Sequence, residues 1–442
     1  MKQAVVLYPG AGVGHVRPMT ELANVFLKHG YDITMTLPPS ASTLSYSCSS
    51  TCIITTSSSK HSSVPSTGIA CTLLSSHVLH RRHRRLHESR HPGLHVFAGS
   101  ASCLSALIQL PTQIAGRQTG LKELGDTPLN FVGIPPMPAS HLIKELLEHP
   151  EDEMCKAMMK IWKHNTETMG VLVNTFELLE SRAVQSLRGP LCIPERILPP
   201  IYCIGPLVSK GAMDDDKAER NECLAWLDAQ PDRSVVFLCF GSKGVLLAEQ
   251  LKEIAIGLER SGQRFLWSMR MPAGSDNPEK YLEVCHELEL DALLPQGFLE
   301  WTKGKGLVAK SWAPQMDVLT HRATGAFVTH CGWNSVLEAI VAGVPMLCLP
   351  LEAEQKMNKV CLTEDMGVAV ELEGNMTGFV KADEVETKVQ LVIEGEEGRQ
   401  LRARVAARRE EAEAALEEGG PSRVAFSQFL LDVDSLGKQL GE

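Results

Sequence analysis

Residues 312–355 read WAPQMDVLTHRATGAFVTHCGWNSVLEAIVAGVPMLCLPLEAEQ, and no other stretch of the 442-residue chain constrains the fold as strongly. Within it, residues 326–329 form a short apolar run that is typical of a buried parallel strand. Gly332 permits a tight turn, and Asn334 or Ser335 suits the N-cap of a following helix. A helix that begins directly after a strand presents N–H groups and the positive end of its dipole to a phosphate. The stretch therefore predicts a parallel α/β sheet with a phosphate site at its carboxyl edge.

Five side chains around this turn have the chemistry to bind the rest of a sugar nucleotide. Trp312 offers a flat face on which a base can stack, and His330 adds an N–H donor at the mouth of the helix. Glu338, one turn into the helix, can accept hydrogen bonds from ribose hydroxyls, and Glu354 and Gln355 can bind sugar hydroxyls. Taken singly, each has a structural alternative, such as Trp312 in a core or His330 satisfied within the protein. Their joint spacing favours the binding site.

Over its full length, the same stretch resembles the signature box of plant UDP-dependent glycosyltransferases of family 1. The resemblance implies an α/β chain of the GT-B class, in which two Rossmann-like domains with parallel sheets face a cleft. It also implies UDP-glucose as the donor substrate, with no metal and no other cofactor. The implied ligand residues are Trp312, Ala313 and Gln315 for the uridine, Ser242, His330, Asn334 and Ser335 for the diphosphate, Glu338 for the ribose, and Glu354 and Gln355 for the sugar, with Trp333 beside them.

Two positions in the box bear on which sugar is used. Gln355 resembles the glucose-using members, because a histidine at the matching position is associated with galactose. Glu354 stands where the family often has aspartate, which keeps the carboxylate and adds a methylene group. The GIPPMPASH stretch at 133–141 resembles flavonoid-glucosylating members, so we expect a small phenolic or flavonoid-like acceptor.

Strand-like and helix-like segments alternate along both halves of the chain, which predicts two doubly wound domains. The first half has predicted strands at 4–8, 32–37, 171–174 and 201–204 and a helix at 18–27. The second half has predicted strands at 234–240, 264–269, 306–311, 326–329 and 344–349 and helices at 246–261, 334–342 and 355–365. The expected division is an acceptor-binding domain at 1–206, a linker at 207–233, a UDP-sugar-binding domain at 234–421, and a last helix at 422–442 that packs back on the first domain.

Composition and charge argue against several other classes of protein. A net charge of −10 argues against a nucleic-acid partner. No apolar run reaches the roughly 18 residues that a membrane helix needs, and the start of the chain does not resemble a signal peptide. The 13 cysteines are dispersed, which favours free thiols in a reducing cytosol. We therefore expect a cytoplasmic monomer whose partners are a UDP-sugar and a small phenolic acceptor, with no integral membrane segment.

His15 is the candidate general base. It lies on the predicted loop after the first strand and matches the GHxxP element of the resembling family. An inverting transfer needs a base to take the proton of the acceptor hydroxyl, and histidine suits that task near neutral pH. The helix dipole, His330 and Ser242 can stabilise the charge on the departing UDP without a metal. The three aspartates at 214–216 are expected to be a solvated charge run in the connector, not a metal site.

Residues 41–97 differ from the rest of the chain. No carboxylate occurs from 33 to 87, Ser and Thr runs are frequent, and no strand–helix alternation is visible. We interpret 41–97 as a foreign stretch, from a frameshift or mis-splicing, that is poorly ordered and deprives the first domain of strands. Histidines at 77, 80, 83, 87, 91 and 95 have helical spacing, but Pro92 and five nearby arginines oppose a metal site, so a disordered basic loop is expected.

The same stretch leads to an alternative function. In the resembling family an aspartate in this region orients the histidine base, but here no aspartate occurs between Asp32 and Asp126. In serine proteases, neutralising the aspartate that orients the histidine costs about 10⁴ in rate. The alternative is thus a catalytically impaired UDP-sugar-binding pseudoenzyme. A third class, a sugar-nucleotide epimerase, is disfavoured because the Trp312 box is specific to transfer enzymes.

Overall fold

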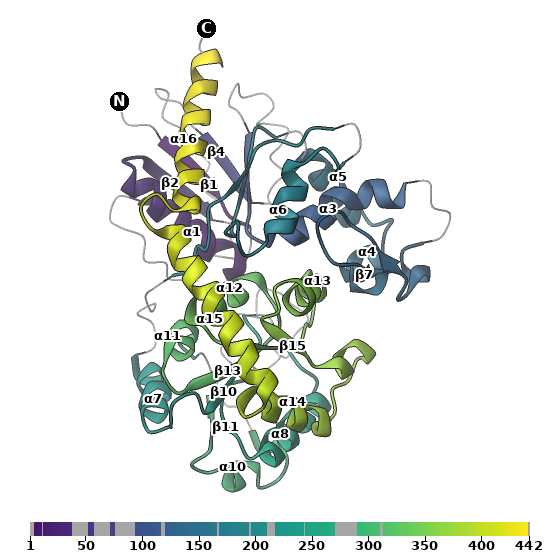
Figure 1. The fold of residues 1–442 in the computed structure, drawn as a ribbon, viewed down its shortest axis with the longest axis vertical. Helices are drawn as coiled ribbons and strands as arrows, with labels where there is room; N and C mark the ends of the chain where they lie inside the picture. The colour runs from purple at the N-terminus through teal and green to yellow at the C-terminus, as the bar shows by residue number, and fades with distance from the viewer. Residues whose placement is uncertain are drawn as a thin grey trace. The chain divides into compact units, whose positions relative to one another are not determined.

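The structure is a computed structural model, and the chain forms two compact units (Figure 1). The first unit combines residues 1–209 with 411–442, and the second spans 210–410. The structure describes residues 4–10, 12–37, 52–56, 71–75, 93–115, 120–165, 168–193, 196–209, 217–242, 244–269, 290–309 and 313–440.

The first unit is built on a parallel sheet of seven strands in the order β3-β2-β1-β4-β5-β8-β9. The strands are β1 (Ala4–Tyr8), β2 (Asp32–Leu37), β3 (Cys52–Thr56), β4 (Cys71–Ser75), β5 (Gly93–Phe97), β8 (Val171–Val173) and β9 (Ile201–Cys203). Strand β1 has β2 on one side and β4 on the other, with Val5 paired to both Ile33 and Cys71. The strand order therefore reverses direction between β1 and β4.

Three of these strands correct the expectation for residues 41–97. The sheet does not lose strands there, because β3, β4 and β5 all lie within that stretch. Each is only five residues long, and a strand inside a parallel sheet needs no more than a short apolar or β-branched run. The histidines at 77, 80, 83, 87 and 91 lie outside the described residues, whereas His95 is buried within β5.

Helices cover this sheet, and the last of them comes from the end of the chain. They are α1 (Val13–Lys28), α3 (Ala101–Ile114), α4 (Lys144–Glu148), α5 (Glu153–Asn165), α6 (Ser181–Arg188) and α16 (Pro421–Leu440), with a short β6–β7 hairpin (Pro128–Leu129, Met137–Pro138). Helix α16 runs beside α1 (Figure 1), and its Phe426 and Phe429 rings pack edge-on against Phe26 of α1. The Tyr202 hydroxyl in β9 donates to Asp432 at 2.6 Å, which adds a polar anchor for α16.

The second unit has a six-stranded parallel sheet in the order β12-β11-β10-β13-β14-β15. The strands are β10 (Val235–Cys239), β11 (Arg264–Ser268), β12 (Gly306–Ala309), β13 (Thr324–Thr329), β14 (Met346–Cys348) and β15 (Ala369–Glu371). This is the strand order of the Rossmann fold, and it reverses between β10 and β13. Ligands of such sheets bind outside the carboxyl ends of the strands at that point of reversal.

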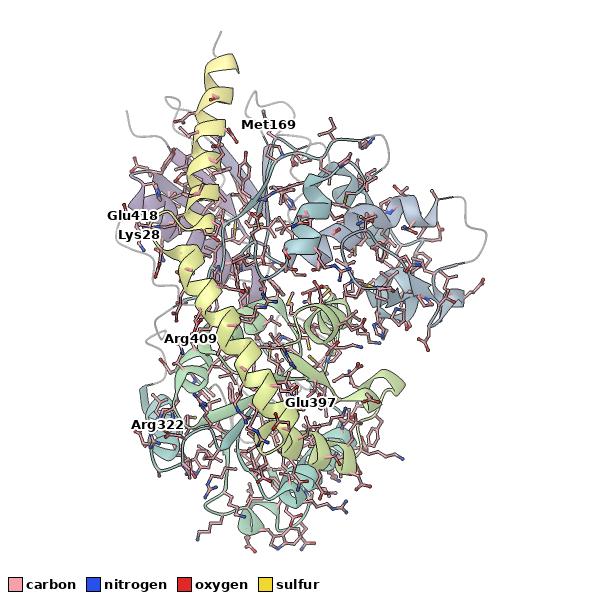
Figure 2. The ribbon with its side chains drawn as sticks, in the orientation of Figure 1. Lys28, Met169, Arg322, Glu397, Arg409 and Glu418 are labelled. Carbon is pink, nitrogen blue, oxygen red and sulfur yellow. The ribbon has the colours of Figure 1, made fainter. Side chains whose placement is uncertain are left out.

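The helices of the second unit include one in the predicted linker. They are α7 (Lys217–Asp228), α8 (Ala248–Ser261), α9 (Leu290–Leu293), α10 (Phe298–Trp301), α11 (Gln315–Thr320), α12 (Trp333–Ala342), α13 (Gln355–Val360), α14 (Ala382–Ile393) and α15 (Glu396–Leu416). Arg322, labelled in Figure 2, donates to the Asp228 carbonyl at 2.9 Å and pairs with Asp232. This contact joins the end of α7 to the start of β13, so the described residues 217–233 of the predicted linker begin with a helix and pack with the second unit.

The described part of the chain contains no helix that is both long and apolar enough to cross a membrane.

Candidate functional site

Two turns meet at the point where the second sheet reverses its strand order. Gly241 and Ser242 follow β10, and His330, Cys331 and Gly332 follow β13. β10 and β13 are paired along their whole length, with Cys239 opposite Thr329 at their carboxyl ends. The sequence therefore places the His-Cys-Gly-Trp-Asn-Ser turn where a Rossmann sheet binds its ligand.

Helix α12 begins earlier than the sequence predicts. Its N-cap is Gly332, so Asn334 and Ser335 lie within the first turn and neither is the N-cap. Trp333, the first helical residue, is only 3% exposed, and burial of its ring fixes this start. Asn334 is half-buried and Ser335 is buried. Because the cap is a glycine and the first turn has no acidic residue, the α12 N-terminus presents backbone donors and a positive dipole end to an anion.

Helix α3 of the first unit, which follows β5, has a different N-terminus. The N-terminus of α3 is occupied by the buried Glu180 carboxyl group, which accepts from the Ala101 and Ser102 N–H groups at 2.9 Å each. Burial raises the pKa of Glu180, and these hydrogen bonds oppose that shift. The protein thus supplies its own carboxyl group at the N-terminus of α3.

His330 lies between two glycines. A Cβ atom at Gly241 would lie 2.7 Å from the His330 Nε2 atom, and one at Gly332 would lie 2.4 Å from the same atom. Both positions must therefore lack a side chain if the imidazole is to lie here. Burial lowers the pKa of His330 from 6.5 to about 4, so the ring is neutral at neutral pH. Its Nδ1 atom is buried and has no hydrogen-bond partner among the described residues.

Gln315, Ser335 and Glu338 form a hydrogen-bonded cluster. The Gln315 amide donates to the Ser335 hydroxyl at 3.0 Å and to the Glu338 carboxylate at 2.5 Å. Glu338 is 5% exposed, and Ala313, at the start of this segment, is 1% exposed. The residues expected at the uridine and at the ribose are therefore in direct contact. Trp312 lies outside the described residues.

A further turn, residues 350–354, lies between β14 and α13, and we name it the sugar turn. Glu354 at its end and Gln355, which begins α13, are the residues expected to bind the sugar. Gln355 is buried, and its Oε1 atom accepts from the Leu351 and Glu352 N–H groups at 2.8 and 2.9 Å. The sequence predicts that Gln355 binds sugar hydroxyls, but its side-chain oxygen already accepts hydrogen bonds from the backbone of the turn. The Gln355 Nε2 group is therefore the part of the amide that can donate a hydrogen bond to a ligand.

Glu354 and Ala353 complete the sugar turn. Glu354 is the N-cap residue of α13, and burial, followed by repulsion from Glu352, raises the pKa of its carboxyl group. Ala353 has a φ of 53°, and Cys331 in the other turn has a φ of 66°. Side-chain-bearing residues avoid this left-handed conformation, and such strain is frequent at binding sites.

Two asparagines that sequence reasoning missed hold these turns. Asn358 on α13 is 1% exposed and donates to the Cys331 carbonyl at 3.0 Å. Asn375 donates to the Pro350 carbonyl at 2.6 Å. Asn358 follows Gln355 by three residues on the same helix, so its spacing was a usable signal. Asn375 lies beyond the box, and no sequence pattern points to it.

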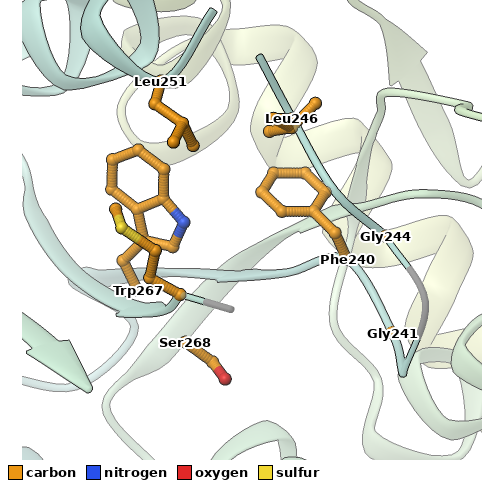
Figure 3. A pocket seen from close by; sticks show the side chains of 8 residues that line it. Phe240, Gly241, Gly244, Leu246, Leu251, Trp267 and Ser268 are labelled. Carbon is orange, nitrogen blue, oxygen red and sulfur yellow. The ribbon is translucent and has the colours of Figure 1, made fainter. Parts of the chain in front are cut away.

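Figure 3 shows a small hollow at the carboxyl ends of β10 and β11. Its lining residues are Phe240, Gly241, Gly244, Leu246, Leu251, Trp267, Ser268 and Met269. The indole nitrogen of Trp267 faces Phe240 across this space and has no hydrogen-bond partner in the part of the chain that the structure describes, whereas the Ser268 hydroxyl points away. The hollow adjoins Gly241, against which His330 packs.

His15 lies in the first unit, in the first turn of α1. The sequence predicted a loop here, but Gly12 has a φ of 99° and serves as the N-cap, so the helix starts at Val13. The His15 N–H donates to the Gly12 carbonyl at 3.1 Å. Because α1 follows β1, His15 lies at the carboxyl edge of the first sheet, where its strand order reverses between β1 and β4.

The two aspartates that flank the acid-poor stretch are placed elsewhere. Asp32 begins β2 opposite Ala4, at the amino edge of the sheet. Asp126 accepts from the Ser140 hydroxyl at 2.6 Å beside the β6–β7 hairpin. Within the described ranges, no three His, Cys, Asp or Glu side chains converge as metal ligands do, and the aspartates at 214–216 lie outside those ranges.

Two parallel α/β units, the second with an anion-binding helix N-terminus and a polar second turn, define a nucleotide-binding chain of the GT-B class. Residues 141–401 match the family model described as "UDP-glucoronosyl and UDP-glucosyl transferase". The match covers more than half of the chain. The protein belongs to this family of UDP-dependent glycosyltransferases.

Individual relatives agree with this assignment. The chain is 38% identical over 470 aligned residues to UDP-glycosyltransferase 13 of Pueraria montana var. lobata, which covers 97% of this chain and 99% of the relative. It is 43% identical over 338 residues to an anthocyanidin 5,3-O-glucosyltransferase of a Rosa hybrid cultivar, covering 76% and 69%. The structure of Phytolacca americana UGT2 with UDP-2-fluoro-glucose and pterostilbene is similar with a TM-score of 0.84 at 30% identity, covering 98% and 100%.

Proposed function

We propose that this protein transfers glucose from UDP-glucose to a hydroxyl of a small phenolic, flavonoid-like acceptor. Family membership makes the chain a UDP-glycosyltransferase. Two relatives support the phenolic acceptor, since the rose enzyme is named for anthocyanidins and the Phytolacca enzyme was crystallised with pterostilbene. Two observations carry the proposal: the α12 N-terminus at the β10/β13 reversal, and the turn after β14 that leads through Glu354 to Gln355.

The assignment of the donor residues follows the order of groups in UDP-glucose. Trp312, Ala313 and Gln315 hold the uridine, and Glu338, held by Gln315, accepts from the ribose. The diphosphate is bound by the α12 N-terminus, where Trp333, Asn334 and Ser335 form the first turn, together with His330 and Ser242. Glu354 accepts from sugar hydroxyls, while the Gln355 Nε2 group donates to one.

The reaction requires one bond to form and one to break. The acceptor oxygen bonds to the anomeric carbon, and the bond from that carbon to the UDP oxygen breaks, so the electron pair leaves with UDP. His15 takes the proton of the acceptor hydroxyl. Attack opposite to the leaving group inverts the anomeric configuration. The α12 N-terminus and the neutral His330 N–H stabilise the charge that develops on UDP.

A second function is favoured by the missing aspartate. The strand next to β1 on the side of the reversal is β4, so a carboxylate just beyond Ser75 would lie on the same sheet edge as His15. The chain has no aspartate from 33 to 125, and its only glutamates there are Glu88 and Glu123. This absence supports a UDP-sugar-binding protein with impaired transfer, because an oriented histidine base loses rate when its carboxylate partner is removed.

Binding and turnover on the same preparation separate these functions. UDP and UDP-glucose are titrated by calorimetry, and glucoside formation with a flavonol is followed by chromatography. The transferase predicts both binding and a glucoside whose formation His15→Ala slows by about 10²–10⁴. The impaired protein predicts unchanged binding without glucoside. Absence of UDP binding would refute both.

A further inference from the structure

The sugar turn, residues 350–354, is held from two sides. On one side, within the signature box at residues 312–355, the Gln355 Oε1 atom accepts from the Leu351 and Glu352 N–H groups. From outside the box, the Asn375 side chain donates to the Pro350 carbonyl at 2.6 Å. Pro350 lies two residues after the end of β14, and Ala353 near the other end of the turn is in the left-handed conformation. The turn therefore combines a strained residue with fixed points at its start and in its middle.

Asn375 is held in place by residues outside the signature box at residues 312–355. It lies in a 3-10 turn, Glu373–Thr377, and its own N–H donates to the Leu372 carbonyl at 3.2 Å. The Glu384 carboxylate on α14 accepts from the N–H groups of Glu373 and Gly374, the latter at 3.0 Å. The approach is close, since a Cβ at Gly374 would lie 2.8 Å from the Glu384 Oε2 atom. Helix α14 thus fixes the 3-10 turn from which Asn375 reaches the sugar turn.

The turn after β13, His330 to Gly332, which is proposed to bind the diphosphate, has an equivalent but separate support. Asn358 donates to the Cys331 carbonyl at 3.0 Å, and Cys331 is the left-handed residue of that turn. Each turn thus has one asparagine amide that fixes a backbone carbonyl. The two amides lie on different elements, Asn358 on α13 and Asn375 on the 3-10 turn, so the turns can be perturbed one at a time.

We propose that Asn375 is a positioning residue for the donor sugar. It fixes the turn that presents Glu354 and Gln355, and so it sets how sharply the site distinguishes glucose from its epimers without affecting the binding of UDP itself. The proposal rests on the proposed function, because it assumes that the sugar turn contacts the hexose. The chemical basis is that epimers differ in the direction of one hydroxyl, and hydrogen bonds weaken steeply when donor and acceptor are misaligned.

The test compares three ligands, UDP, UDP-glucose and UDP-galactose, by calorimetry. Asn375→Asp keeps the side-chain shape but cannot donate to Pro350, and Asn375→Ala removes the group. Glu373→Gln is the matched control, because it changes the same 3-10 turn at a side chain that pairs with Lys388 and not with Pro350. We expect both Asn375 variants to lower the preference for UDP-glucose over UDP-galactose by about three- to tenfold, the effect of one net hydrogen bond. Their UDP affinity and the control should stay within about twofold of the wild type.

The possible outcomes distinguish the role of Asn375 from the proposed contact between the sugar turn and the hexose. An unchanged sugar preference in Asn375→Asp and Asn375→Ala, with a wild type that does prefer UDP-glucose, would overturn the role of Asn375 alone. Equal loss of affinity for all three ligands would also overturn it, because it would show a general structural role. A wild type that binds UDP but does not distinguish the two sugars would refute the proposed sugar contact and this inference with it.

Discussion

The contact between Gly332 and His330 gives the sharpest prediction for the diphosphate site. Gly332 has a φ of −64° and a ψ of 135°, which alanine adopts without strain. A Cβ there would lie 2.4, 3.1 and 3.2 Å from three atoms of the His330 ring, and these are its nearest neighbours. Gly332→Ala is therefore a substitution whose closest steric conflict is with one imidazole.

The expected magnitude follows from these distances. Ordinary contact begins at 3.4 Å, so the ring must move by about 1 Å, which is enough to break a hydrogen bond. A hydrogen bond from the imidazole N–H to a diphosphate is charge-assisted and contributes about 1.5–3 kcal/mol. We expect Gly332→Ala to weaken UDP binding by about 10- to 100-fold.

A double-mutant cycle shows whether the loss acts through His330. His330→Ala should weaken UDP binding to a similar degree and should also make room for the new methyl group. In that background, Gly332→Ala should leave UDP affinity nearly unchanged, and the difference between glycine and alanine as N-cap, about 0.5–1 kcal/mol, should appear only in thermal unfolding. The coupling energy in UDP binding should therefore be about 1.5–3 kcal/mol. UDP titration by calorimetry at pH 7.5 measures all four proteins, and thermal unfolding checks that each is folded.

Two results would refute this reasoning. Unchanged UDP affinity in Gly332→Ala would mean that the imidazole does not contact the diphosphate. An equal loss with and without the His330 side chain would mean that Gly332 acts through the helix N-terminus and not through the ring.

Three other predictions follow from single contacts. Gln355→Glu should keep the acceptor for the sugar turn but lose the amide donor, so UDP-glucose binding should weaken while UDP binding and the melting temperature hold; Gln355→Leu should lower the melting temperature as well. His95 is fully buried, neither of its ring nitrogens has a hydrogen-bond partner among the described residues, and burial lowers its pKa from 6.5 to about 4. The unfolded chain then binds the proton first, so the contribution of His95 to stability falls as pH drops from 6.5 towards 4, by about 2 kcal/mol at pH 5. His95→Leu should remove this loss in denaturant unfolding at pH 7.5 and 5, and an unchanged pH dependence would contradict it. Tyr202→Phe removes the hydrogen bond to Asp432 and should destabilise the α16 contact by about 1 kcal/mol, seen as faster proteolysis of the C-terminal helix.

Much of the second unit could be predicted from local sequence. Apolar runs and glycines place β13, α12, β14 and α13 within a few residues of their observed bounds, because strand and helix in a parallel α/β unit each leave a distinct pattern. The start of α12 was predicted one or two residues late. The N-cap preference of Asn334 and Ser335 was overridden by the burial of Trp333, and that burial depends on the rest of the fold.

The first unit shows where such reasoning failed. Residues 52–56, 71–75 and 93–97 are strands, although serine-rich and basic surroundings hid them. A deficit of carboxylates says nothing about strands inside a parallel sheet, whose residues face packed layers on both sides. His95 lies in this stretch, and neither of its ring nitrogens has a hydrogen-bond partner among the described residues. Its neighbours Val96 and Phe97 are apolar, so burial of the polar imidazole reduces the stability of the fold.

The hydrogen bonds within the site could not be predicted at all. Gln315 and Glu338 are 23 residues apart, and Asn375 and Pro350 are 25 apart. Their contacts depend on how two turns are folded, including the left-handed Cys331 and Ala353. The sequence identified which side chains have the right chemistry, but only the fold shows which of their atoms the protein already uses.

The central claim is that this chain transfers glucose from UDP-glucose with inversion. The direct measurement is nuclear magnetic resonance analysis of the products formed by the wild-type protein from UDP-glucose and a flavonol. We predict one equivalent of UDP for each glucoside and a β linkage at the anomeric carbon, since the donor linkage is α. An α-glucoside would contradict the single displacement assisted by His15. Bound UDP-glucose that yields no glucoside would contradict the transferase and leave the sugar-nucleotide-binding protein as the function of this chain.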